Sequence, residues 1–360
     1  MSERATAGAG RDLGLDAFRG LTVLLMAIVN LQGDGAVAFP WLVHAEWDGL
    51  TFADLVFPWF LLAVGLSVPL ALRAGRPPAL SDVVRRVAVL LVIGVVLGWL
   101  IRPTLDPEQV RWVGVLQRIA VVYLVCVLVA GRFSGPLVPA LLAALCLVVH
   151  SLALLLVAAP AEPGPSLAMG QGFSAWVDQK VVPGRLHRGT WDPEGAWSTL
   201  SAIGTGLIGV AFARLHAERG GKAVAGVAVV LAGAGLALMP VLPLNKALWT
   251  ASYALVATGS GVALWLGLRR IVATGRAERS LALLVIAGQT ALTVFVAHML
   301  LIAILVRKVS GETLWSILFG GLQRLTLPDA VTSLVFAIIA TGIALAPVPW
   351  LKRRGWLIRA

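Results

Sequence analysis

Ten apolar stretches follow one another along the chain, separated by short polar segments that contain glycine and proline. A helix needs about 20 mainly apolar residues to cross a hydrocarbon core of about 30 Å, and each stretch is long enough. The pattern therefore predicts an all-α fold, a polytopic integral membrane bundle of about ten transmembrane helices. The stretches lie at about residues 15–33, 51–73, 83–102, 112–131, 136–159, 194–215, 222–241, 246–268, 281–306 and 328–350. A further apolar segment, 313–322, is too short to span, and we expect it to lie at the interface or to re-enter.

The composition agrees with a membrane protein and excludes several other classes. Of 360 residues, 59% are hydrophobic and 13% are charged, whereas soluble domains have about 25% charged and about 45–50% apolar residues. This difference excludes a soluble globular enzyme, a disordered chain and a disulfide scaffold. Cys126 and Cys146 lie within apolar stretches, where they act as small hydrophobic side chains, and their spacing predicts no metal site.

The distribution of basic residues predicts the orientation. Ten spans place both termini on one side, and the segments on that side hold 18 Lys and Arg residues against 9 on the other. Basic residues collect in cytoplasmic loops, so we expect cytoplasmic N- and C-termini in a multi-pass protein of the cell inner membrane. The net charge of +11 has the same origin, and no nucleic-acid partner is expected.

This orientation divides the chain into three parts. We expect a short cytoplasmic N-terminal segment at 1–14, a single transmembrane domain at 15–350 and a basic cytoplasmic tail at 351–360. The long segment 160–193, rich in turn-forming glycine and proline, is then on the outer side, where we expect it to cap a site.

Polar side chains gather around the first predicted outer loop, 33–50. Asn30 lies at the end of the first span, His44 lies in the loop, and Asp54 lies near the start of the second span. Imidazole titrates near neutral pH without any perturbation, so His44 is the candidate general base. The alternative interpretation is an interfacial loop that carries a belt of tryptophans.

Four further polar residues lie within the predicted spans. Asp16 and Arg19 are three residues apart at the inner start of the first span, where they either pair structurally or contact a cytoplasmic ligand. Gln117 and Arg118 lie a few residues into the fourth span. We expect Arg118 to face the bundle and bind an acidic or carbonyl group.

The remaining candidates lie at or near the outer ends of later spans. Asp192 and Glu194 precede the sixth span and Asn245 precedes the eighth, positions at which helix capping is the alternative interpretation. His298 lies about 25 Å along a straight ninth helix, hence in the outer half, where it can meet the His44 region. The sequence contains no motif of a serine hydrolase, a zinc protease or a P-loop NTPase.

Several of these residues lie in a specific motif, His44-Ala45-x-Trp47-x-Gly49-x-x-x-x-Asp54-x-x-Phe57-Pro58. With the other segments it resembles the heparan-alpha-glucosaminide N-acetyltransferase family and its bacterial homologues. The other segments of the resemblance are 15–21, Asn30, 114–118, 192–195, 243–253 and His298.

The resemblance implies a transmembrane acyltransferase that uses acetyl-CoA from the cytoplasm and acetylates an amino sugar or glycan on the other side. It implies that His44 is the key histidine and Asn30 its supporting asparagine. It also implies membrane lipids as surroundings, no metal and a homodimer. Asp48 and Thr290 stand where the lysosomal relative has asparagine, so the resemblance leaves the identity of the acceptor open.

Two other functions remain as alternatives. A transporter or flippase for sugars or lipid-linked sugars usually binds its substrate near the midplane, whereas the polar residues here gather on one side. A non-catalytic scaffold gives no reason for that gathering. If the chain is an acyltransferase, basic residues such as Arg19, Arg269 and Arg270 attract the phosphates of CoA, and His44 acts as a base or as a transient acetyl carrier.

Overall fold

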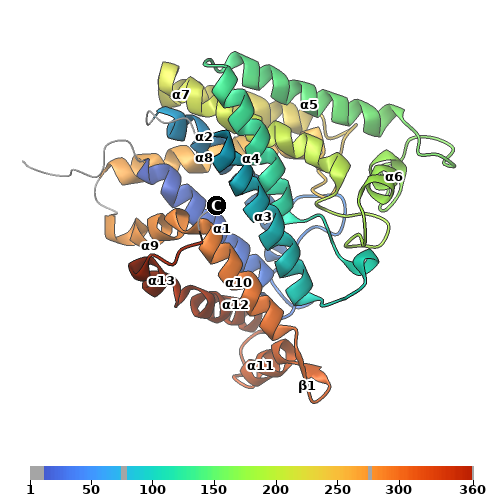
Figure 1. The fold of residues 1–360 in the computed structure, drawn as a ribbon, viewed down its shortest axis with the longest axis vertical. Helices are drawn as coiled ribbons and strands as arrows, with labels where there is room; N and C mark the ends of the chain where they lie inside the picture. The colour runs from blue at the N-terminus through green and yellow to red at the C-terminus, as the bar shows by residue number, and fades with distance from the viewer. Residues whose placement is uncertain (1–11, 74–78, 275–277, 359–360) are drawn as a thin grey trace, which may run out of the picture.

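The computed structural model describes residues 12–73, 79–274 and 278–358 and is built almost entirely of helices (Figure 1). By length and composition eight helices can cross a membrane, or nine if a bent pair counts as one span. The helices are α1 (Leu13–Asn30), α2 (Phe52–Arg73), α3 (Leu80–Ile101), α4 (Val115–Arg132), α5 (Leu137–Leu156), α6 (Gly172–Val181), α7 (Ala196–Ala237), α8 (Ala251–Ala273), α9 (Glu278–Gln289), α10 (Ala291–Leu305), α11 (Leu314–Gln323), α12 (Asp329–Leu345) and α13 (Val348–Arg354). Two short 3-10 helices, η1 (Pro40–Leu42) and η2 (Pro107–Gln109), and one hairpin, β1 (Lys308–Val309) with β2 (Glu312–Thr313), complete the fold. The prediction of an all-α polytopic bundle is confirmed.

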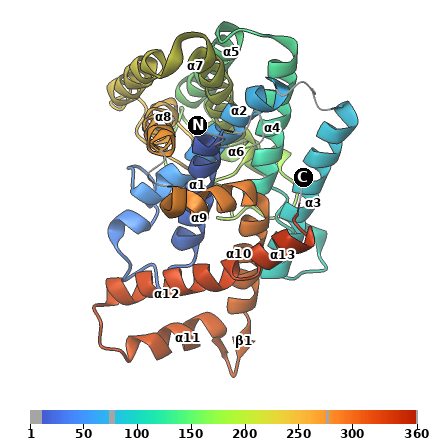
Figure 2. The same ribbon diagram turned by 90° about the vertical axis from the view of Figure 1, so that its left-hand side faces the viewer.

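Helix α7 contains two of the predicted spans. Its 42 residues correspond to about 63 Å of helix, twice the thickness of the hydrocarbon core. Gly220 interrupts the helix with a φ of 76°, a conformation that glycine adopts without steric cost. The residue before α7, Gly195, contacts Arg118 near the start of α4, and Gly235 packs on Ser252 at the start of α8. Both ends of α7 therefore lie at one end of the bundle, and the chain reverses at Gly220 (Figure 2).

The expectation of one straight helix over 281–306 is wrong. Helices α9 and α10 meet at an angle of 87°, and the Thr290 hydroxyl at the break donates to the Ile286 carbonyl at 2.9 Å, a contact that bends helices. Helix α9 also crosses α1 so closely that the two backbones are in contact. A Cβ atom on Gly288 would lie 1.8 Å from the carbonyl oxygen of Asp16. The 25 Å distance along the helix assumed that this helix is straight and does not apply, although His298 still lies at the same end of the bundle as Asn30.

The bundle has a buried centre and an apolar outer surface. Helices α1, α2 and α8 are about two-thirds buried over their most apolar windows, whereas α3 is only 11% buried and exposes Leu91, Val92 and Val96. Exposed apolar side chains on a spanning helix face lipid. We call the end of the bundle where α1 and α3 finish and α2 and α4 begin the Asn30 end, and the opposite end the Arg19 end. The short segment 313–322 forms most of α11, which packs beside α12 (Figure 2).

Candidate functional site

His44 lies at the Asn30 end, between η1 and α2, and is held by the first turn of α2. Its Nδ1 atom lies 2.9 Å from Oδ1 of Asp54. The His44 side chain is 44% exposed whereas that of Asp54 is 1% exposed, so a buried carboxylate holds an accessible ring. A carboxylate oxygen only accepts hydrogen bonds, and Nδ1 therefore carries the proton. This tautomer places the lone pair of the ring on Nε2, the nitrogen that would act as a base.

Asp54 is fixed by a set of local donors. Its Oδ2 accepts the main-chain N–H groups of Ala45 at 3.1 Å and Thr51 at 3.0 Å, and the Thr51 hydroxyl at 3.0 Å. Its main-chain carbonyl accepts the Tyr253 hydroxyl at 2.7 Å. Both carboxylate oxygens of Asp54 therefore have donors, and the three at Oδ2 fix the orientation in which Oδ1 holds the histidine.

The loop that carries His44 is docked on the segment that leads into α8. Asn245 donates through Nδ2 to Oδ1 of Asp48 at 3.0 Å and accepts the N–H of Leu248 at 2.8 Å. The N–H of Gly49 donates to the carbonyl of Leu244 at 2.8 Å. Asn245 therefore joins two loops, and the structure does not use it as the side-chain cap of α8.

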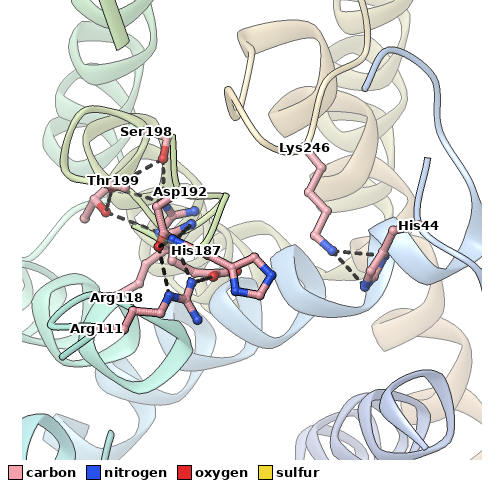
Figure 3. A network of polar contacts seen from close by, with 10 residues as sticks. His44, Arg111, Arg118, His187, Asp192, Ser198, Thr199 and Lys246 are labelled. Atoms are coloured by element: carbon pink, nitrogen blue, oxygen red, sulfur yellow. Dashed lines mark hydrogen bonds and ion pairs between the residues drawn. The ribbon is translucent and has the colours of Figure 1, made fainter. Parts of the chain in front are cut away.

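Lys246, which follows Asn245, completes the surroundings of His44 (Figure 3). Its Nζ lies 3.0 Å from Nδ1 and 3.1 Å from Nε2 of His44, and 3.7 Å from Oδ1 of Asp54. Equal distances to both ring nitrogens place the ammonium group over the ring. Burial lowers the pKa of Lys246, and the carboxylates of Asp54 and Glu194 oppose this shift.

A second polar cluster at the same end joins Arg111 to two carboxylates (Figure 3). Arg111 donates to Asp192 at 2.8 and 2.5 Å and to Glu194 at 2.5 Å. Burial raises the pKa of Glu194, but Arg111, Arg118 and Lys246 outweigh burial, so the net shift is downward. Asp192 also accepts the N–H groups of His187 and Glu194. The two carboxylates thus serve an ion-pair network and do not cap α7.

Arg118 is buried beside this cluster. Its guanidinium donates to the Gly195 carbonyl at 3.2 Å, to Ser198 at 2.5 Å and to Thr199 at 3.2 Å. It lies over the Trp249 ring, 4.9 Å from the ring centroid. Arg118 faces the bundle and binds the start of α7, and within the described residues its hydrogen bonds do not extend to His44.

Asn30 and His298 form a separate pair at this end. Asn30 Nδ2 lies 3.4 Å from His298 Nε2. Asn30 borders a cavity of about 450 Å³, which Gln117, Arg111 and His187 also line. The structure therefore brings Asn30 to His298 and to Gln117, and brings His44 to Asp54 and Lys246.

Another cavity, of about 320 Å³, lies nearer the Arg19 end and is lined by Arg19, Arg86 and Gln289. Counted from the Arg19 end, this is the first cavity and the 450 Å³ cavity is the second. Leu116 and Phe295 line both cavities, so these two side chains separate them. The two cavities follow one another through the bundle between α1, α3, α4 and α10. Arg19 is 4.0 Å from Asp16, and Arg269 pairs with Asp12 at 2.6 Å.

Sequence reasoning passed over Lys246 and Arg111. A signal for Arg111 exists, because Asp192 and Glu194 need a cation and Arg111 lies in a loop predicted on the same side. No comparable signal exists for Lys246, whose neighbour His44 is 202 positions away. Within residues 12–73, 79–274 and 278–358, no three His, Cys, Asp or Glu side chains are grouped so that they could hold a metal ion.

Comparison with known proteins gives two kinds of match. Residues 11–170 match the family described as "Heparan-alpha-glucosaminide N-acetyltransferase, catalytic". Two curated relatives carry the name heparan-alpha-glucosaminide N-acetyltransferase. The Mus musculus protein is 36% identical over 143 residues, which are 37% of this chain and 21% of the relative. The Homo sapiens protein is 35% identical over 131 residues, which are 34% of this chain and 19% of the relative. The match thus spans about a fifth of the length of these relatives.

The matched region contains the His44–Asp54 pair, Asn30, Gln117 and Arg118. The partners of these residues in later segments of the chain, Lys246 and His298 among them, lie outside it.

Proposed function

We propose that the chain is a membrane-embedded acetyltransferase of the heparan-alpha-glucosaminide N-acetyltransferase-like family, a proposal supported by the family match over residues 11–170 and by the two relatives. It moves an acetyl group from cytoplasmic acetyl-CoA to an amino sugar or glycan on the opposite side of the membrane. The observation that carries this proposal is the His44–Asp54 pair, an accessible imidazole held through Nδ1 by a buried carboxylate at 2.9 Å.

In the proposed reaction the Nε2 atom of His44 takes the proton of the acceptor amine or hydroxyl as that group attacks the thioester carbonyl. The C–S bond then breaks, and the proton passes from His44 to the departing CoA thiolate. A second route has Nε2 itself attack the carbonyl, which gives an acetyl-histidine that the acceptor then attacks. Asp54 fixes the ring in both routes.

Lys246 is the cation nearest the reacting atoms in this scheme. Attack on the thioester places negative charge on the carbonyl oxygen, and a donor preorganised beside that oxygen lowers the barrier. The Nζ atom of Lys246 lies 3.1 Å from Nε2 of His44, beside the position where the attacked carbonyl must lie. Lys246 therefore stabilises the oxyanion, and the carboxylates of Asp54 and Glu194 hold its positive charge at this end of the bundle.

The two cavities support a donor path through the bundle. Arg19 and Arg86 at the first cavity supply positive charge for CoA phosphates. Leu116 and Phe295 must move apart for the pantetheine arm to reach the second cavity. There Asn30 supplies an amide donor for the thioester carbonyl. The excess of basic residues at the Arg19 end supports a cytoplasmic position for that end.

The decisive experiment mixes the purified protein with labelled acetyl-CoA and a panel of amino sugars and glycans. Wild type should transfer label to at least one acceptor, and His44→Ala should transfer none while keeping its circular dichroism spectrum and elution volume. His216→Ala is the matched control, because His216 lies in α7 against Trp265, away from the site. Transfer by His44→Ala at the wild-type rate would show that the assignment is wrong.

A transporter of sugars or lipid-linked sugars is the second candidate, and the succession of two cavities through the bundle favours it. Proteoliposomes separate the two functions. A transporter moves labelled sugar without acetyl-CoA, whereas the acetyltransferase modifies the sugar only when acetyl-CoA is supplied. Uptake of unmodified sugar without acetyl-CoA would favour the transporter.

A further inference from the structure

Positive charge gathers at the mouth of the 450 Å³ cavity. Arg102, Arg111 and Arg185 all line it, together with His187. The main chain holds these residues together, because Arg111 forms an isolated β-bridge with Gly184 and the N–H of Arg185 donates to the Val110 carbonyl at 3.0 Å. Three guanidinium groups therefore come from two loops and one helix end to the same place.

The carboxylates of this region neutralise only one of these three arginines. Asp192 and Glu194 both pair with Arg111. Across the described ranges neither Arg102 nor Arg185 has a carboxylate within ion-pair distance. The Nε atom of Arg185 is buried and has no hydrogen-bond partner among the described residues, and a buried donor without a partner is costly.

Two electrostatic observations also indicate that an anion would bind beside Arg185. Burial and the neighbouring charges of Arg102 and Arg111 lower the pKa of Arg185. Burial and Arg111 lower the pKa of His187, so its imidazole resists taking up a further positive charge at this place. An anion at this point would pair Arg185 Nε and relieve the repulsion between the guanidinium groups.

We propose that Arg102 and Arg185 form a binding site for the carboxylate, sulfate or phosphate group of a molecule that occupies this cavity. The rest of the cavity lining is partly polar, with Asn30 and Gln117, and partly apolar, with Leu97 and Phe295. The bound molecule therefore carries one anionic group at the mouth and a less polar body inside. If the bound molecule is the acceptor, the role of this site rests on the proposed acetyltransferase function.

Binding is measured first without turnover. Glucosamine 6-phosphate is titrated into the full-length protein in detergent, with uncharged glucosamine as the reference probe. We expect the phosphate sugar to bind wild type more tightly than glucosamine. Arg185→Gln and Arg102→Gln should each weaken it about tenfold, because each removes a charge-assisted bond. Added salt should reduce the difference.

The matched control is Arg188→Gln, which removes the same charge from the same loop three residues further on. Arg188 is exposed and does not line the cavity, so its variant should bind like wild type. Arg185→Lys keeps the charge but lacks the planar fork, and it should recover only part of the affinity. Equal binding by Arg185→Gln and wild type, or an equal loss in Arg188→Gln, would overturn the proposal.

Kinetics then identify which substrate carries the anion. If it belongs to the acceptor, the two variants raise KM for glucosamine 6-phosphate and leave KM for glucosamine and for acetyl-CoA unchanged. If it belongs to the donor, they raise KM for acetyl-CoA and weaken binding of CoA more than of CoA without its 3′-phosphate. Failure of the proposed function appears differently, as anion binding that persists in a protein that acetylates neither sugar.

Discussion

Replacing Asp54 by asparagine changes one atom and reverses the tautomer of His44. Oδ2 of Asp54 accepts three donors, from Ala45 and Thr51, so the amide oxygen of asparagine must take this position. Its NH₂ group must then take the position of Oδ1, which faces Nδ1 of His44 at 2.9 Å. An NH₂ group only donates, so Nδ1 becomes the acceptor and the ring proton moves to Nε2. His44 can then no longer act as a base at Nε2.

The size of this effect follows from the role of the ring. In a serine protease the corresponding aspartate-to-asparagine change lowers kcat by about 10⁴ because the histidine takes the wrong tautomer. We expect kcat of Asp54→Asn to fall by about 10³ to 10⁴, which corresponds to about 4 to 5.5 kcal/mol of barrier. The three donors at Oδ2 keep their acceptor, so the fold should survive.

The assay is acetyl transfer at saturating acetyl-CoA, with thermal melting of the same samples. Asp106→Asn is the control, since Asp106 is an exposed acid that caps η2 through the N–H of Glu108. It should keep wild-type kcat. A kcat for Asp54→Asn within tenfold of wild type, with the melting temperature unchanged, would refute the assignment of His44 as a base oriented by Asp54.

Three other substitutions test the electrostatics and the packing. Lys246→Met removes the ammonium group 3.1 Å from His44 Nε2 and should lower kcat by about 10² to 10³, measured in the same transfer assay, with Lys246→Arg partly active. Burial raises the pKa of Asp178 from 3.8 to about 6, so wild type loses stability as pH rises through this window. Asp178→Asn should melt like wild type near pH 4 and be up to about 3 kcal/mol more stable at pH 8 in thermal melts. Gly288→Ala places a Cβ 1.8 Å from the Asp16 carbonyl and should lower the melting temperature by several degrees, whereas Gly267→Ala, with open space around its Cβ position, should leave it unchanged or raise it.

The hydropathy pattern was sufficient for the fold class, because the length of an apolar stretch is a property of neighbouring residues. It was not sufficient for the break between α9 and α10. That break depends on the Thr290 hydroxyl, which bonds back to Ile286, and on the close backbone approach of Gly288 to Asp16 on α1. A single hydroxyl barely changes the hydropathy of its stretch, and the contact of Gly288 with the distant helix α1 leaves no mark on it.

The same distinction applies to the candidate site. His44 and Asp54 are ten residues apart, so a local motif suggests that they lie close together. Lys246 is 202 residues from His44, and His298 is 268 residues from Asn30. Which helix neighbours which is decided by packing of small residues in three dimensions, so sequence reasoning joined Asn30 to His44 where the structure joins Asn30 to His298.

This arrangement has a consequence for the proposed reaction. The second cavity is lined by Asn30 and Arg111, whereas His44 lies beside Lys246. Arg111 pairs with Glu194, and Glu194 interacts electrostatically with Lys246. Charges of alternating sign thus lead from Arg111 at the cavity through Glu194 to Lys246 beside the histidine. A thioester that enters through the cavity must displace or rotate Lys246 to reach Nε2. The ammonium group then comes to lie beside the developing oxyanion, so the movement that opens the path also stabilises the charge.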